Sequence, residues 1–152
     1  MDYHEILPRL FVGSYPGSTE DIETLRRNGI SAVLNLQTDS DVQHFKFDWD
    51  SLLARYKTCG IQLRRIPVRD FDTADLKDKL PACISALKDL IGSSHRVYLH
   101  CSAGTGRSPS VAIAYLCCCG WDLDAAAAHV EQCRPCAPNM EAIRLAMRAS
   151  GK

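Results

Sequence analysis

One ten-residue segment, His100–Pro109, restricts the fold of this chain more than any other part of it. It follows Arg96–His100, whose apolar alternation predicts a short strand, and it precedes a long apolar stretch that predicts a helix. Gly104 and Gly106 let the backbone curl so that several N–H groups converge on one point, and the helix that follows adds its positive N-terminal end. The segment therefore predicts a strand–loop–helix unit that binds an anion such as phosphate.

The reactive side chains of this loop stand at its two ends. The N–H groups and the helix end favour the thiolate of Cys101 over its thiol, which makes it a candidate nucleophile. The guanidinium of Arg107 can hold two phosphate oxygens and stabilise a transferring phosphoryl group. Ser108 suits the N-cap position and Pro109 the first helical position, and the Ser108 hydroxyl can also donate to the departing thiolate. The predicted chemistry is a covalent phosphocysteine intermediate.

The rest of the chain alternates between strand and helix patterns, which is typical of an α/β domain. We expect a mainly parallel central sheet with helices on both faces, an edge strand at Phe11–Val12, and a single domain over residues 1–152. Pro81 falls inside one helical stretch and indicates either a false start or a kink. Strands are predicted at 30–36, 61–68 and 96–100, and helices at 18–28, 49–59, 75–91, 109–119, 122–132 and 139–149, with N-caps at Asp122 and Asn139.

Composition excludes several partners. Lysine plus arginine equals aspartate plus glutamate, at 18 each, so no net charge favours nucleic acid or an anionic membrane. The longest apolar run, Val111–Cys119, has nine residues, whereas a membrane helix needs about 20. Eight cysteines, three of them adjacent, suit reduced thiols in an intracellular compartment. We expect a monomer, and any organelle address would lie outside this chain.

These residues resemble the cysteine-dependent protein tyrosine phosphatases, whose signature H-C-x-x-x-x-x-R-[ST] the segment matches in full. The resemblance implies that family's three-layer α/β fold, with Cys101 as nucleophile and no cofactor. It also implies an aspartate, about thirty residues earlier in the dual-specificity branch, that protonates the leaving oxygen. Asp70 lies 31 residues before Cys101 and takes that role, with Asp72 and Asp75 as competitors. The phosphate-binding residues would be Ser102, Ala103, Gly104, Thr105, Gly106 and Arg107.

Over nearly the whole chain the sequence is similar to the plant starch-excess-type, laforin-like glucan phosphatases, most closely to the form without a carbohydrate-binding module. The matching stretches include 36–39, 69–72, 97–104 and 134–139. The resemblance implies a phosphorylated glucan of the starch or glycogen type as substrate, and a chloroplast location for a plant or algal protein, otherwise the cytoplasm. It also implies an aromatic platform for sugar rings at Phe45 and Phe71, assisted by Phe47 and Trp49, although core packing is the alternative for each ring.

Departures from the glucan-specific pattern at Thr105, Ser108 and Ala137 keep two other functions open. The first is a dual-specificity protein phosphatase acting on phosphotyrosine and phosphoserine or phosphothreonine. The second is a non-catalytic phosphate- or glucan-binding scaffold, which the joint presence of Cys101, Arg107 and Asp70 disfavours.

Four other features of the sequence give weaker signals. Cys133 and Cys136 have zinc-like spacing with His129 nearby, but no second ligand pair completes a site, so no metal is expected. The arginines at 64, 65 and 69 either attract phosphorylated substrate or form a solvated strand face. Asn35 stands where relatives often have a redox partner cysteine, which leaves the thiols at 59 and 83 as candidates for pairing with the nucleophile. Tyr115 and Trp121 are expected in the core.

Overall fold

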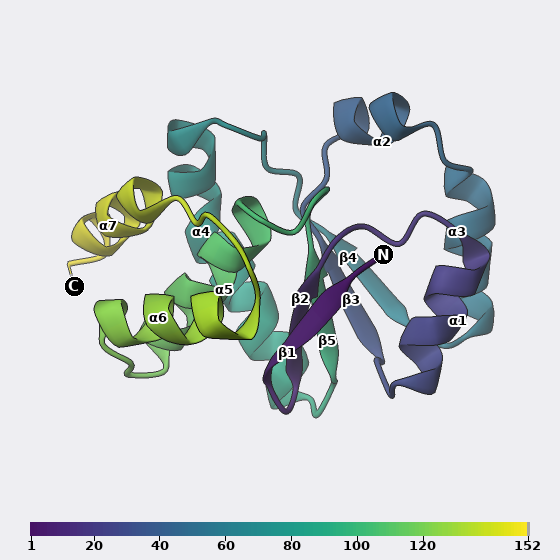
Figure 1. Cartoon of the computed structure of the whole chain (residues 1–152), viewed down its shortest axis with the longest axis horizontal. Helices are drawn as coiled ribbons and strands as arrows, with labels where there is room; N and C mark the ends of the chain where they lie inside the picture. The colour runs from purple at the N-terminus through teal and green to yellow at the C-terminus, as the bar shows by residue number, and fades with distance from the viewer. Residues whose placement is uncertain (152) are drawn as a thin grey trace.

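A five-stranded sheet with helices on both faces forms the framework of the computed structural model, which describes residues 1–151 (Figure 1). The strand order is β1-β2-β5-β3-β4, with β1 antiparallel to β2 and the other neighbours parallel. The elements, in chain order, are β1 (Tyr3–Leu7), β2 (Leu10–Gly13), α1 (Thr19–Arg27), β3 (Ala32–Asn35), α2 (Asp39–Phe45), α3 (Trp49–Thr58), β4 (Gln62–Arg65), α4 (Thr73–Gly92), β5 (Val97–His100), α5 (Arg107–Cys118), α6 (Leu123–Cys133) and α7 (Met140–Ala149).

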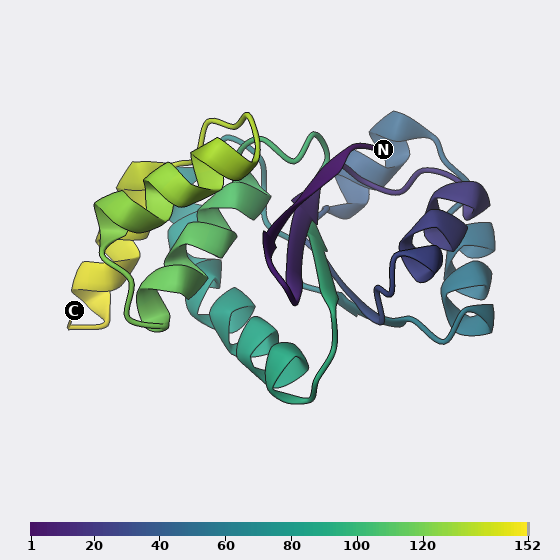
Figure 2. The same ribbon diagram turned by 60° about the horizontal axis from the view of Figure 1, so that its bottom comes forward.

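Two apolar clusters fix the sheet between its helical layers. The larger one joins the sheet to α4–α7 and includes Leu34, Leu99 and Ile113, all fully buried. The smaller one joins the opposite face to α1 and α3 through Ile22, Val33 and neighbouring side chains. Figure 2 shows α4–α7 on one side of the sheet and α1 with α3 on the other. The predicted three-layer α/β fold is confirmed.

Capping explains where several helices begin. Ser18, Asp122 and Asn139 each accept a hydrogen bond from the backbone amide three residues later, so the N-caps predicted at Asp122 and Asn139 are confirmed and Ser18 caps α1. Gly29 and Gly60 follow α1 and α3 with φ values of +79° and +69°, the left-handed conformation in which a helix commonly ends. Both ends agree with the sequence prediction.

The N-terminal half differs from the prediction in two places. Phe11–Val12 does not form an edge strand, because β1 pairs with β2 and is itself the edge. The polar segment after β3 contains a short helix, α2, which begins with a capping box between Thr38 and Asp41. Neither element shows a clear apolar period: α2 has no buried residue, and β1 has only Ile6 buried.

The C-terminal half resolves one open point and corrects two predictions. Helix α4 is continuous through Pro81, so the proline is not a false start, and the neighbouring Leu80 and Cys83 are buried. Helix α5 begins at Arg107 with Gly106 as N-cap, so Ser108 and Pro109 occupy its second and third positions, where an amide needs no intrahelical acceptor. Trp121 is 37% exposed instead of entering the core, and its ring lies 5.0 Å from the His129 ring at a tilt of 48°, whereas Tyr115 is buried as expected.

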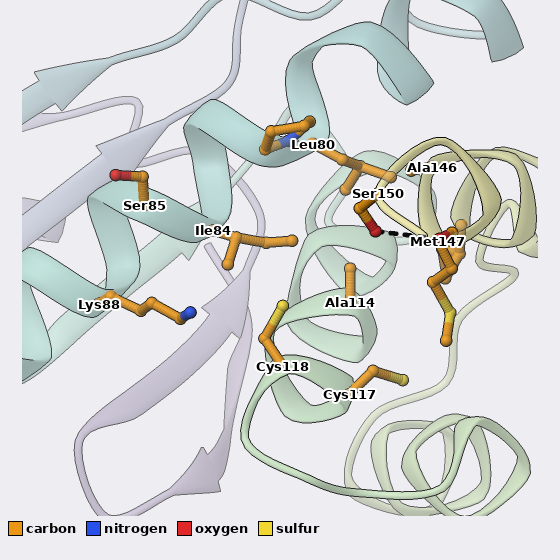
Figure 3. A pocket seen from close by; sticks show the side chains of 12 residues that line it. Leu80, Ile84, Ser85, Lys88, Ala114, Cys117, Cys118, Ala146, Met147 and Ser150 are labelled. Carbon is orange, nitrogen blue, oxygen red and sulfur yellow. Dashed lines mark hydrogen bonds between the residues drawn. The ribbon is translucent and has the colours of Figure 1, made fainter. Parts of the chain in front are cut away.

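A groove of about 290 Å³ lies between α4, α5 and α7, lined mainly by apolar side chains such as Leu80, Ile84 and Met147 (Figure 3). Its lining includes no residue of the loop between β5 and α5. Within residues 1–151, no helix combines the length and apolar character that crossing a membrane requires.

Candidate active site

Every backbone carbonyl of the loop from Ser102 to Gly106 accepts a hydrogen bond from a residue outside the loop. Among the described residues, the amides of 102–107 donate no hydrogen bond, so they remain available to an anion. This is the geometry of an anion-binding nest at a helix N-terminus. The donors are the Tyr15 amide to Ser102 (3.0 Å), Arg134 to Ala103 (3.0 Å) and Gly104 (2.7 Å), the Ala137 amide to Thr105 (2.7 Å) and the Ser110 amide to Gly106 (3.1 Å).

Gly104 is required at its position for two reasons. Its φ of +74° lies in the left-handed region, and a Cβ built there would stand 2.5 Å from the carbonyl carbon and oxygen of Gly13. The end of β2 therefore packs directly against the loop. Any side chain at 104 would have to move one of these two backbones, and with it the amides that face the anion.

Gly104→Ala is accordingly expected to lower kcat/KM on a small aryl phosphate by about 100-fold, the loss associated with misplacing reacting groups by about 1 Å. Gly60→Ala is the matched control, because Gly60 has a similar φ of +69° but nothing within 4 Å of its Cβ position. The control is expected to cost only about 1 kcal/mol of stability through backbone strain. Equal activity in the two variants would show that the contact between Gly104 and Gly13 is unimportant.

Cys101 lies at the start of the loop, at the end of β5, and is only 2% exposed. Its Sγ is 3.2 Å from the Oγ of Ser108, which α5 places below the loop. The adjacent His100 is buried, and its Nδ1 lies 2.9 Å from the carbonyl oxygen of Cys101. Because a carbonyl can only accept, Nδ1 carries the proton in this contact.

Burial lowers the pKa of His100 to about 4. An unfolded histidine titrates near 6.5, so between these values the unfolded chain binds a proton that the folded chain does not, and stability falls as the pH drops. Above pH 6.5 His100 is neutral in both the folded and the unfolded chain, so it causes no loss of stability there. We expect the free energy of unfolding to decline by up to about 1.4 kcal/mol per pH unit across this range, in excess of any other acid-linked change.

Urea denaturation between pH 4 and 8 measures this slope. His100→Asn is expected to flatten it, because asparagine does not titrate there. His44→Asn, at an exposed position on α2, is the control. A slope that is the same in wild type and His100→Asn would rule out His100 as its source.

Arg107 is 3% exposed, and hydrogen bonds to several partners fix the orientation of its guanidinium. Nη1 donates to Oδ2 of Asp41 (2.7 Å) and to the carbonyl of Val68 (2.8 Å), and Nη2 donates to the hydroxyl of Ser102 (3.3 Å). Nε lies 3.4 Å from Oδ1 of Asp70. The predicted loop arginine and the predicted aspartate therefore face each other.

Asp41 is a site residue that sequence reasoning missed. Burial favours a higher pKa for its carboxyl, but hydrogen bonds from Arg107 and the Thr38 amide outweigh burial and hold the pKa below the usual value. Asp41 is therefore an anion at neutral pH that orients Arg107. The available signal was the acid three residues after Thr38, which is a variant of the capping-box pattern.

The three candidate aspartates, which lie just before α4 or in its first turn, have different surroundings. Asp72 caps α4 by accepting from the amide of Asp75 (2.9 Å), and it pairs with Arg69 (3.1 Å). Asp75 accepts from the Arg69 amide (2.7 Å), which with Lys79 holds its pKa low. Asp70, with 40% of its side chain exposed, is the one of the three that contacts Arg107. It borders a cavity of about 200 Å³ that Gly106 and Arg107 also line.

The predicted aromatic residues lie on the surface or at its edge. Phe71, in the same cavity wall as Asp70, is 99% exposed at a φ of +56°, and Phe45 is 40% exposed. Phe47 and Trp49 are half-buried and pack partly against the smaller core cluster. Tyr15, not singled out from the sequence, joins them, with its ring 4.7 Å from Phe45 and 5.3 Å from Phe47 between centroids.

The weaker sequence signals do not assemble into a second site. Arg64, Arg65 and Arg69 each lie within 4 Å of a carboxylate, so they are paired rather than a free positive patch. Within residues 1–151, no three histidine, cysteine, aspartate or glutamate side chains are grouped so that they could hold a metal ion. Cys59 donates to Glu23 between α1 and α3, whereas Cys83 lies in the same core cluster as Cys101.

A buried cysteine and a buried arginine stand at the two ends of a loop with the geometry of an anion-binding nest, on a sheet of this topology, as expected for a cysteine-dependent phosphatase. The model of the dual specificity phosphatase catalytic domain matches residues 10–149, and the chain belongs to this family.

Several curated relatives carry glucan-related names. The chain is 38% identical to phosphoglucan phosphatase DSP4, amyloplastic, of Castanea sativa, over 96% of this chain and 40% of that protein. It is 34% identical to phosphoglucan phosphatase LSF1, chloroplastic, of Arabidopsis thaliana, over 94% and 24%. Mouse laforin is 30% identical over 80% and 38%. The chain thus spans less than half the length of each of these relatives.

Solved structures support the fold. The active form of Tk-PTP aligns with a TM-score of 0.78 at 22% identity, covering 97% of this chain and 94% of that one. The human tyrosine phosphatase-like serine/threonine/tyrosine-interacting protein aligns with the same TM-score at 21% identity, covering 98% and 95%. At these identities the likeness concerns the fold alone.

Proposed function

We propose that this chain hydrolyses glucose-bound phosphate monoesters of a starch- or glycogen-type glucan through a phosphocysteine intermediate. The observation that carries the phosphatase chemistry is the contact of Arg107 with Asp70, at the end of a loop that follows Cys101 and whose amides donate no hydrogen bond within residues 1–151. The glucan substrate is supported by the names of the relatives DSP4, LSF1 and laforin.

In the first step the Cys101 thiolate attacks phosphorus, an S–P bond forms and the P–O bond to the sugar breaks. Arg107 and the amides of residues 102–107 hold the phosphoryl oxygens and stabilise their charge. Asp70 donates a proton to the departing sugar oxygen, which would otherwise leave as an unstable alkoxide. The products of this step are the free glucan hydroxyl and phosphocysteine.

In the second step water attacks the phosphocysteine. Asp70, now a carboxylate, accepts a proton from the water as the new O–P bond forms and the S–P bond breaks. The Ser108 hydroxyl, 3.2 Å from Sγ, donates a hydrogen bond to the thiolate that is released. Inorganic phosphate leaves and the enzyme is restored.

We further propose that Phe45, Phe71 and Trp49 contact the glucan, with Phe71 next to the reacting phosphate. Aromatic faces stack on the C–H faces of sugars. The backbone of Phe71 is strained by its positive φ, and strained residues of this kind cluster at functional sites. Phe71→Ala is expected to lower kcat/KM on phosphorylated glucan by about tenfold, equal to about 1.4 kcal/mol, and to leave an aryl phosphate within about twofold.

Leu53→Ala provides the control, since Leu53 is an exposed apolar side chain, 38% accessible, on α3. It is expected to change neither substrate. Equal losses on glucan and aryl phosphate in Phe71→Ala would remove Phe71 from the glucan platform.

A dual-specificity protein phosphatase remains the alternative, favoured by a 37% identity to human dual specificity protein phosphatase 2 over 112 residues. We propose a monomer in an intracellular compartment, which would be a plastid in a plant or alga, as the names of the plant relatives suggest for those proteins, and otherwise the cytoplasm. The contact of Arg107 with Asp70, on the loop that follows Cys101, disfavours the non-catalytic scaffold.

A further inference from the structure

A second buried guanidinium, that of Arg134 at the C-terminal end of α6, lies behind the phosphate loop. Arg134 is 2% exposed, and its Nε and Nη2 donate to the carbonyls of Gly104 (2.7 Å) and Ala103 (3.0 Å). A Cβ on Gly104 would stand 2.7 Å from Nη2, so the loop backbone rests directly on the guanidinium. The loop is therefore held between Arg107 and Arg134.

The two carbonyls that Arg134 contacts belong to the peptide units that carry the next amides. The Ala103 carbonyl shares a peptide unit with the Gly104 N–H, and the Gly104 carbonyl shares one with the Thr105 N–H. A charged donor on the oxygen of a peptide unit polarises it and makes its N–H a stronger donor. Arg134 thus acts on the groups that face the anion without touching the anion itself.

The other contacts of Arg134 are with the N-terminal segment. Nη2 pairs with the Asp2 carboxylate at 3.0 Å, and Nη1 lies 3.2 Å from Nδ1 of His4. The Asp2 side chain is 73% exposed, so water screens its charge and it neutralises the guanidinium only in part. These contacts raise the possibility of a purely structural role, in which Arg134 only fastens β1.

We propose that Arg134 is a positioning residue of the phosphatase site, which fixes and polarises the Gly104 and Thr105 amides so that the loop binds the transferring phosphoryl group. The proposal rests on the proposed phosphocysteine chemistry and extends it to a residue outside the signature. It predicts that the loop's affinity for any tetrahedral oxyanion depends on this guanidinium.

Arg96 offers a matched control. It also donates to two carbonyls, those of Pro8 (3.1 Å) and Asn28 (3.2 Å), and it lies over the Phe11 ring. It precedes β5, at the end of the strand opposite the phosphate loop. Its replacement removes comparable structural contacts without disturbing the site.

The experiment measures tungstate binding by calorimetry in Arg134→Gln, Arg134→Lys, Asp2→Asn and Arg96→Gln, together with kcat and KM on an aryl phosphate. Because direct oxyanion donors are worth about 100-fold or more, an indirect one is expected to weaken tungstate binding by about tenfold in Arg134→Gln. Arg134→Lys keeps the charge but not the planar arrangement of N–H donors, and its tungstate affinity is expected to fall about threefold. Asp2→Asn and Arg96→Gln are expected to stay within about twofold of wild type.

Wild-type tungstate affinity in Arg134→Gln would overturn the proposal, and so would an equal loss in Asp2→Asn, because the role would then be to fasten β1. If Arg134→Gln does not fold, the lysine variant decides in the same way. Tungstate binding needs no turnover and no glucan. The result can therefore be interpreted even if the substrate proves not to be a phosphorylated glucan.

Discussion

Cys101→Ser is expected to abolish phosphate release, with kcat falling by about 10⁴-fold or more, as for the removal of other enzymatic nucleophiles. A serine hydroxyl fits the same space but is a far weaker nucleophile than a thiolate, and within residues 1–151 the side chain that hydrogen-bonds Cys101 Sγ is Ser108, which is not a base. The loop amides and Arg107 remain, so the variant is expected to retain binding of the phosphorylated substrate. Phosphate release and substrate pull-down measure the two properties separately.

Cys119→Ser is the control for this substitution, because Cys119 is exposed at the end of α5 and outside the site. It is expected to keep wild-type turnover. Phosphate release by Cys101→Ser at more than about 1% of the wild-type rate would contradict nucleophilic catalysis by Cys101.

Asp70→Asn is expected to reduce kcat on a sugar phosphate by about 10²- to 10³-fold, because an amide cannot protonate the leaving oxygen. An aryl phosphate carries a more acidic leaving group, so its turnover is expected to fall much less. The ratio between the two substrates is therefore the informative quantity. It separates a general acid from a residue that only positions Arg107, whose loss would affect both substrates equally.

Asp72→Asn is the matched control for Asp70→Asn. Asparagine remains a good N-cap, so α4 is expected to keep its start while the pairing with Arg69 is lost. Turnover of both substrates is expected to stay near wild type. A larger loss of kcat in Asp72→Asn than in Asp70→Asn would move the general acid to Asp72.

The phosphate loop could be predicted because its parts are adjacent in the sequence. A strand, two glycines and a helix start lie within 15 residues, and local backbone chemistry determines their geometry. Even there the helix begins two residues earlier than predicted: Gly106 is the N-cap of α5, and the Ser108 hydroxyl contacts Sγ of Cys101 instead of capping the helix.

The supporting residues could not be predicted, because they act across long separations in the sequence. Asp41 reaches Arg107 over 66 residues, and Arg134 reaches Gly104 over 30. Tyr15 is placed by β2, whose partner β1 has a single buried side chain and hence no clear alternating pattern. Such contacts depend on the sheet order, which periodicity does not supply.

The substrate is decided by measuring phosphate release from solubilised phospho-amylopectin and from phosphotyrosine and phosphothreonine peptides side by side, with Cys101→Ser as the blank. We expect a kcat/KM preference for glucan that depends on Phe71 and disappears in Cys101→Ser. A preference for phosphopeptides would contradict the glucan substrate and favour the protein phosphatase. Absence of release from both, with the glucan still bound, would contradict the enzymatic account and indicate a binding scaffold.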